Sequence, residues 1–230
     1  DFMPSSEDLQ KKFLGLTTDI SIAAGHQTYA TQAQSNRYGF PVSRLTPILP
    51  ECKVTNHKKK EKIIILSPDI IEHSSSKITR TEVVDYLTNK LEDFELITIE
   101  DMSLDEYLDL ASRAMFSITF GEGLDGYFIE PILSGGVSFA VFNPMFFPVE
   151  FVKHPTVFCS WDVFLKSIVD DIKKYTADSS SYEQVSAAIR KDILDIYQPS
   201  VSLSDLKMSL NSEYGFSPKY NTNNSKYLDN

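Results

Sequence analysis

The amino-acid sequence predicts an α/β fold, namely a doubly wound, Rossmann-like parallel sheet followed by a helical C-terminal extension. First, short β-branched runs alternate with helical patterns through the middle of the chain, which is the order of a parallel sheet with helices on both faces. Second, the connections between these segments are short. Third, the apolar residues that follow Trp161 recur at helical spacing. With 42% hydrophobic and 23% charged residues among 230, the chain has the composition of a globular protein.

Five strands are expected in this sheet. The first has the sequence KIIILS and ends at Pro68. An unbroken apolar run of this kind is typical of a strand that is buried on both faces. In chain order the five segments are Lys62–Ser67, Phe94–Ile99, Met115–Phe120, Val137–Asn143 and Thr156–Cys159.

Capping motifs mark the helices between the strands. Thr79 with Glu82, and Ser103 with Glu106, each form the Ser/Thr-x-x-Glu pattern that satisfies free amide groups at a helix start. Each pattern opens a segment with an apolar stripe, which predicts a helix packed on the sheet. A short helix is also expected within Gly121–Gly136.

Two longer helices are predicted after the fifth strand. The first begins at Trp161 and carries apolar residues at helical spacing. The second is expected to be capped by Ser180 and Glu183 and to end at Pro199.

The first fifty residues follow a different pattern. A short helix over Ser5–Leu14, a strand over Asp19–Ala24 and a helix over Thr28–Tyr38 are expected. The polar segment NHKKKEK then precedes the first strand of the sheet, and we expect it to be a solvated linker. Its lysines, Lys58–Lys60, are also candidates for contact with anionic lipid.

Composition excludes several classes of protein. A net charge of -10 argues against a nucleic-acid binder, which needs a positive surface. No apolar run approaches the ~18 residues that a membrane-spanning helix needs, and the first residues lack the pattern of a signal peptide. Cys52 and Cys159 cannot form a disulfide framework, so we expect a reduced, cytosolic protein with Cys159 buried. The four histidines have no ligand spacing, so no metal site is expected.

The stretch Phe120–Gly136 (FGEGLDGYFIEPILSGG) carries the candidate chemistry. It directly follows a predicted strand, at the carboxyl edge where open α/β sheets bind ligands. Its glycines allow close approach of the backbone to a ligand, and the next helix would offer N–H groups to a diphosphate. Glu122 and Glu130 lie in the turn and about one helical turn later, where carboxylates would accept hydrogen bonds from sugar or ribose hydroxyls. The alternative is a glycine turn with two surface glutamates.

This stretch, followed by the strand VSFAVFN, resembles the donor-binding signature of the GT-B fold glycosyltransferases. In that family two glutamates with seven residues between them follow a strand, with a glycine-rich turn between them. Glu122 and Glu130 match that pair in spacing and context. Thr18–Pro50 is similar to the last strand–helix unit of the family's N-terminal domain and the crossing into its C-terminal one. Val157–Ile172 is similar to the strand and helix that close the donor domain.

The resemblance implies the C-terminal, nucleotide-sugar-binding half of a group 1 type GT-B enzyme. Such a hexosyltransferase-like enzyme moves a sugar from a nucleotide diphosphate sugar to a glycan, lipid-linked or protein acceptor, with no metal or other cofactor. Glu122 would meet the donor sugar as the catalytic residue, and Glu130 would hold the ribose hydroxyls. In the loop SPDIIEHSSSK after the first strand, Lys77 is the one lysine or arginine that could grip the diphosphate. The implied donor-binding residues are Gly121, Gly123, Asp125, Gly126, Tyr127, Glu130 and Lys77.

Domain boundaries follow from the same resemblance. Residues 1–55 would be a remnant of the N-terminal acceptor domain with the interdomain linker, 56–200 the nucleotide-sugar-binding domain, and 201–230 a C-terminal helix and polar tail. We therefore expect a fragment of a longer cytoplasmic enzyme of polysaccharide biosynthesis, with peripheral membrane contact as an option. Two other interpretations stay open. One is a non-catalytic glycosyltransferase-like module that binds a partner or a nucleotide sugar, and the other is an unrelated flavodoxin-like binding domain.

Overall fold

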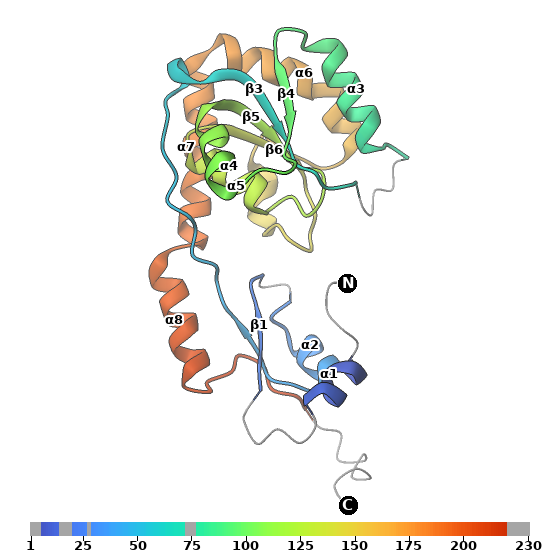
Figure 1. Ribbon diagram of the computed structural model, residues 1–230, viewed down its shortest axis with the longest axis vertical. Coiled ribbons are helices and arrows are strands. Elements are labelled where there is room, and N and C mark those ends of the chain that lie inside the picture. Colours follow the sequence, from blue (N-terminus) through green and yellow to red (C-terminus); the bar gives the residue numbers. More distant parts are fainter. Residues whose placement is uncertain (1–5, 14–19, 27–28, 72–76, 220–230) are drawn as a thin grey trace, which may run out of the picture. The chain divides into compact units, whose positions relative to one another are not determined.

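The fold is described from a computed structural model, which describes residues 6–13, 20–26, 29–71 and 77–219 (Figure 1). Its internal contacts divide the chain into two compact units. The larger unit comprises residues 50–195, and the smaller unit comprises residues 1–49 together with 196–230. The N-terminal segment therefore shares its unit with the C-terminal one.

A five-stranded parallel sheet forms the centre of the larger unit, in the order β4-β3-β5-β6-β7. Its register is fixed by pairs such as Ile64 with Leu96 and Ile64 with Phe116. All five predicted strands are present, so the doubly wound α/β prediction is confirmed. The strands are β3 (Glu61–Leu66), β4 (Glu95–Thr98), β5 (Ala114–Ile118), β6 (Val137–Val141) and β7 (Val157–Phe158).

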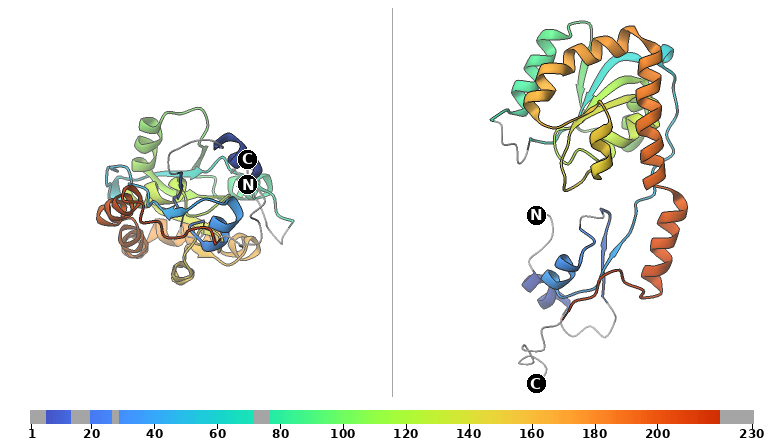
Figure 2. Two further views of the ribbon diagram at one scale, coloured as in Figure 1. Left: turned by 90° about the horizontal axis from the view of Figure 1, so that it is seen from below. Right: turned by 180° about the vertical axis from the view of Figure 1, so that it is seen from behind.

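Helices cover both faces of this sheet (Figures 1 and 2). Because side chains alternate along a strand, Ile64 and Leu66 of β3 enter one core with α3, α6 and α7, while Ile63 and Ile65 enter the opposite core with α4. That alternation explains why the run from Ile63 to Leu66 is apolar throughout. The helices of this unit are α3 (Arg80–Lys90), α4 (Leu104–Arg113), α5 (Gly126–Leu133), α6 (Trp161–Ala177) and α7 (Ser179–Ile196), with short 3-10 turns η1 (His57–Lys59) and η2 (Val149–Lys153).

Helix starts follow the sequence in two cases and depart from it in a third. Both predicted capping boxes, at Thr79 and at Ser103, are formed. The expected cap at Ser180 is wrong, because α7 already begins at Ser179. There the Asp178 carboxylate accepts hydrogen bonds from the amides of Ser180 and Ser181. Cys159 is exposed rather than buried, since β7 ends one residue before it.

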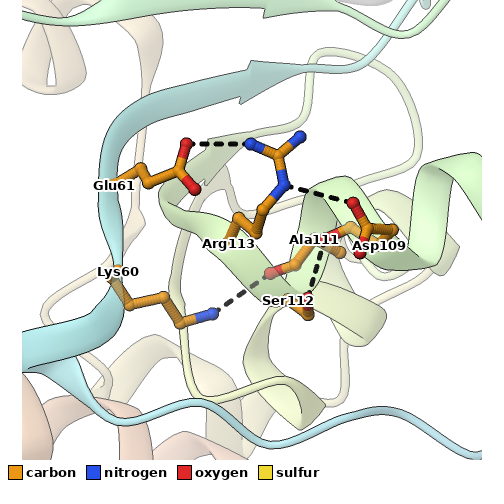
Figure 3. Close-up of polar contacts among 6 residues, drawn as sticks. All are labelled: Lys60, Glu61, Asp109, Ala111, Ser112 and Arg113. Carbon is orange, nitrogen blue, oxygen red and sulfur yellow. Dashed lines mark hydrogen bonds and ion pairs between the residues drawn. The ribbon is translucent and has the colours of Figure 1, made fainter.

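Lys60 is not part of a solvated linker. Its side chain is buried next to β3, and its Nζ donates a hydrogen bond of 3.1 Å to the carbonyl oxygen of Ala111 in the last turn of α4 (Figure 3). Burial lowers the pKa of Lys60 to about 7. Arg113 nearby forms ion pairs with Glu61 and Asp109. The lysine run thus divides, with Lys58 and Lys59 exposed and Lys60 buried.

The smaller unit is built on a parallel pair of short strands, β1 (Ile22–Ala24) and β2 (Val42–Arg44). Phe216 forms an antiparallel bridge to Val42, which ties the C-terminal segment to β2. The helices of this unit are α1 (Ser6–Phe13), α2 (Gln32–Tyr38) and α8 (Pro199–Leu210). Parts of the predicted first helix, strand and second helix lie outside the described residues, as does the tail from residue 220.

Helix α8 turns a polar side toward β2. The buried Asp205 carboxylate accepts hydrogen bonds from the backbone amide of Thr46, at 3.0 Å, and from its hydroxyl, at 2.6 Å. The Arg44 guanidinium lies 3.9 Å from the same carboxylate oxygen. On the helix's exposed side lie Leu203, Leu206, Met208 and Leu210. Polar contacts therefore fasten α8 in the smaller unit.

We expect Asp205→Ala to destabilise the smaller unit by about 3 kcal/mol, because it removes a charged acceptor and leaves the buried Thr46 amide unpaired. Hydrogen exchange followed by mass spectrometry should show faster exchange in peptides that contain Thr46 and α8. The exposed Ser204 supplies a matched control, Ser204→Ala. Equal exchange in both variants would contradict this role for Asp205.

Among the helices of the described residues, none is both long and apolar enough to span a lipid bilayer.

Candidate functional site

The candidate site lies at the carboxyl edge of the sheet, where β3 and β5 end. Strand order reverses between these two neighbours, because the chain leaves β3 toward β4 and returns to β5 on the other side. Ligands of open α/β sheets bind at such a switch point. The buried Ser67 joins the two strand ends, since its amide donates to the Ile118 carbonyl and its hydroxyl accepts from the Phe120 amide, both at 3.0 Å.

The glycine-rich turn follows β5 directly. Gly123 has φ +89°, a left-handed conformation, and a Cβ there would lie 2.3 Å from Cε2 of Phe147. A Cβ on Gly121 would lie 2.9 Å from Cβ of Asp69, in the segment that follows β3. The two loops are thus in close contact, and both positions require glycine.

The start of α5 carries three of the predicted donor-binding residues. Asp125 is its N-cap, and Oδ1 of Asp125 accepts a hydrogen bond of 3.0 Å from the amide of Phe128. Gly126 and Tyr127 are the first two helical residues. The Phe128 amide is therefore occupied by the protein's own carboxylate, which leaves the preceding turn and the first two helical residues as the places for a ligand to approach.

Glu130 lies one turn into α5, and its carboxylate folds back over the helix start. A Cβ on Gly126 would lie 2.7 Å from Oε2 of Glu130. The Tyr107 hydroxyl, from α4, lies 3.2 Å from the same oxygen and 3.1 Å from the Gly126 carbonyl oxygen, and it can donate to either. Burial raises the pKa of Tyr107, and the charge of Glu130 adds to that rise. Tyr107 thus orients Glu130 and is a residue that the sequence did not reveal.

Four carboxyl groups surround the start of α5. Burial, followed by the charge of Asp69, raises the pKa of Asp125 to about 8, and the charges of Glu122 and Glu130 add to the rise. Burial raises the pKa of Glu130 itself to about 7. The structure therefore brings the predicted Glu122 and Glu130 into range of the same group, Asp125. Neither Asp125 nor Glu130 is fully ionised at neutral pH.

Arg80 is the cation at this edge that sequence reasoning missed. Its guanidinium donates two hydrogen bonds, of 3.1 and 3.2 Å, to the Ser67 carbonyl and one to the Thr98 hydroxyl. It also stacks over the ring of Phe120, 5.1 Å from its centroid. Arg80 thereby joins the carboxyl ends of β3, β4 and β5. Its position directly after the capping Thr79 is the signal that would have found it, because that turn faces the carboxyl ends of the strands.

Lys77, the predicted diphosphate ligand, is exposed in the segment before α3. Within the described part of the chain, no group of three or more His, Cys, Asp or Glu residues is arranged to hold a metal ion.

Comparison with known proteins supports the fold class. No protein family matches the sequence, and no curated protein sequence does. The structure is similar to the crystal structure of TarM, a glycosyltransferase of the GT-B fold, with a TM-score of 0.50 and 12% identity over 74% of this chain. This chain spans 38% of the TarM chain. At this identity the similarity shows a shared fold, and it agrees with the Rossmann-like α/β class predicted from the sequence.

Proposed function

We propose that this chain is the donor-binding portion of a hexosyltransferase-like glycosyltransferase. It would transfer a sugar from a nucleotide diphosphate sugar to a glycan, lipid-linked or protein acceptor. The observation that carries the proposal is the pair Glu122 and Glu130, placed on a glycine-rich turn and the following helix at the switch point of a GT-B-like fold. The acceptor-binding residues would lie outside the larger unit, residues 50–195.

Each part of the donor has a proposed contact. Glu130, oriented by Tyr107, would accept hydrogen bonds from the ribose hydroxyls. Glu122 would face the donor sugar as the catalytic residue. Backbone amides of the turn from Gly121 to Gly126, including that of Asp125, would contact the diphosphate, with Tyr127 and Lys77 beside it.

Arg80 strengthens this assignment for the diphosphate. A guanidinium held at the ends of three strands provides fixed positive charge where negative charge develops on the departing nucleoside diphosphate. Because the charge is already oriented, it needs no reorganisation during the reaction. The protein's contribution would be positioning of the donor and stabilisation of the leaving group.

We expect the protein to bind one of UDP, GDP or dTDP in the presence of EDTA, because the proposed contacts are carboxylates, backbone amides and an arginine rather than a metal. Isothermal titration calorimetry at pH 8 measures this directly. Absence of heat with all three nucleotides would refute the donor site.

Turnover separates the enzyme from the non-catalytic binding module. An enzyme should hydrolyse its nucleotide sugar slowly when water replaces the acceptor, and Glu122→Ala should abolish that release of nucleoside diphosphate. Binding of the nucleotide sugar without any release of nucleoside diphosphate would favour the non-catalytic module.

A further inference from the structure

Asp69 is a carboxylate at the switch point that the proposed contacts do not use. It follows the end of β3 by three residues and packs against the glycine-rich turn. From the position of a Cβ on Gly121, the Asp69 atoms Cβ, Cγ and Oδ2 lie at 2.9, 3.0 and 3.3 Å. The side chain therefore lies directly beside the turn that carries Glu122.

One oxygen of Asp69 has no hydrogen-bond partner. Oδ2 is buried, and within the described residues nothing donates a hydrogen bond to it. A buried carboxylate oxygen without a donor is costly, so such an atom calls for a donor, which a ligand at this edge would supply. The close packing against Gly121 holds the side chain in place.

The charge of Asp69 also acts on the start of α5. It contributes to the raised pKa of Asp125 and to that of Tyr127. Asp69 thus lies between the end of β3 and the helix start, on the same edge as Glu122 and Glu130. A hydroxyl or ammonium group of a ligand at this edge would find acceptors on more than one side.

We propose that Asp69 is a third carboxylate of the donor site, that its Oδ2 accepts a hydrogen bond from a hydroxyl or ammonium group of the donor sugar, and that the site therefore selects neutral or amino sugars over uronic acids. The inference rests on the proposed function. Two observations support it, namely the buried Oδ2 atom without a hydrogen-bond partner among the described residues and the close packing of Asp69 against Gly121.

The negative charges of Asp69 and Glu122 determine which donor sugars the site would prefer. A uronic acid would bring a further carboxylate next to Asp69 and Glu122, where like charges repel one another in a partly desolvated setting. A neutral sugar offers hydroxyl donors at the same positions, and an amino sugar offers an ammonium group. Arg80 is held by Ser67 and Thr98 and is assigned to the diphosphate, so its charge is balanced by the phosphates rather than by a sugar carboxylate.

Calorimetric titration of Asp69→Asn tests the inference. The probes are UDP, UDP-glucose, UDP-glucosamine and UDP-glucuronate, or the guanosine or thymidine counterparts if the nucleotide test selects those bases. The wild type should bind UDP-glucose at least about tenfold more tightly than UDP-glucuronate. Asp69→Asn should leave UDP affinity within about twofold, weaken UDP-glucose about tenfold and reduce the preference over UDP-glucuronate, because one charged acceptor is lost.

A matched control and a second variant keep the test sharp. Glu100→Gln makes the same acid-to-amide change at an exposed position after β4, and it should alter neither affinity. Asp69→Ser, with its melting temperature measured beside that of Asp69→Asn, identifies any loss of folding.

If wild-type protein binds UDP but Asp69→Asn binds UDP-glucose normally, the inference is refuted and the proposed function stands. Equal weakening of UDP and UDP-glucose would make Asp69 a structural residue and also overturn it. No nucleotide binding by the wild type would refute the proposed function and the inference together.

Discussion

Lys60→Met is expected to stabilise the larger unit by about 2–4 kcal/mol at pH 6, because the substitution removes a buried ammonium group and keeps the side chain's length. Burial lowers the pKa of Lys60 from 10.5 to about 7. A difference of that size corresponds to at most about 5 kcal/mol, and the hydrogen bond to Ala111 recovers part of the cost.

The sign of the pH dependence follows from the two pKa values. Between pH 7 and 10.5 the unfolded chain holds a proton that the folded protein has released, so stability rises with pH in this window. Below pH 7 both states are protonated and the buried charge has its full cost. The gain from Lys60→Met should therefore be largest at pH 6 and shrink steadily toward pH 10.

Thermal unfolding at pH 6, 8 and 9.5 measures this gain as a difference between variant and wild type. The difference isolates Lys60, because other shifted groups such as Asp125 and Glu130 are the same in both proteins. Lys59→Met, at the exposed neighbouring position, is the control and should change stability little. A gain that does not depend on pH would show that folding does not lower the pKa of Lys60. A loss at every pH would show that the Ala111 contact outweighs the burial of the charge.

Lys60 also illustrates why the sequence predicts one part of this molecule and misses another. The three adjacent lysines, Lys58–Lys60, have similar polar neighbours in the sequence, so all three are predicted to be exposed to solvent. Their fates differ because β3 begins at Glu61, which places the preceding side chain against the last turn of α4. Ala111, whose carbonyl oxygen accepts the hydrogen bond from Lys60, is about fifty residues away in the chain, so no local sequence pattern predicts this contact.

The strands and the capping boxes were predictable because each depends on neighbouring residues. The apolar run from Ile63 to Leu66 is typical of a strand buried on both faces, and Thr79 has its partner Glu82 within one helical turn. The Ser180 cap failed for a related reason. Asp178 stands two residues earlier, and its carboxylate accepts from the amides of Ser180 and Ser181, so the helix begins before Ser180 can act as its cap.

The residues of the candidate site also fall into two groups, those predictable from local sequence and those that depend on tertiary packing. The glycine turn and the two glutamates are visible as a local pattern, and the topology places them at the switch point. Arg80, Tyr107 and Asp69 reach that point from other elements, and their contacts depend on how β3, α3 and α4 pack. The loop after β3 carries Lys77, whereas Arg80 lies three residues further along the chain, at the start of α3.

Glu130→Ala should weaken binding of the free nucleoside diphosphate at least about tenfold, and by more if both ribose hydroxyls are held. A hydrogen bond to a charged acceptor is worth roughly 1.5–3 kcal/mol, and 1.4 kcal/mol is a factor of about ten. Tyr107→Phe should have a smaller effect in the same direction, because it keeps the carboxylate but removes the hydroxyl that orients it.

The raised pKa of Glu130, about 7, adds a pH dependence to this prediction. Below that pH the carboxyl is protonated and is a weaker acceptor, so affinity of the wild type should fall from pH 8 to pH 6. Glu130→Gln keeps the shape without the titration, and it should lose this part of the slope. The ligand's own phosphate titrates equally against both proteins, so the difference between them belongs to Glu130.

Glu122→Ala supplies the contrast that assigns the two roles. If Glu122 meets the sugar and Glu130 the ribose, Glu122→Ala should leave free nucleoside diphosphate unaffected and weaken the nucleotide sugar or its turnover. Calorimetry with both ligands against both variants measures the four affinities. Equal losses of free nucleotide in the two variants would reject the division of roles while keeping the site. No loss in either variant would mean that neither glutamate contacts the donor, because removal of a charged hydrogen-bond acceptor carries a measurable cost.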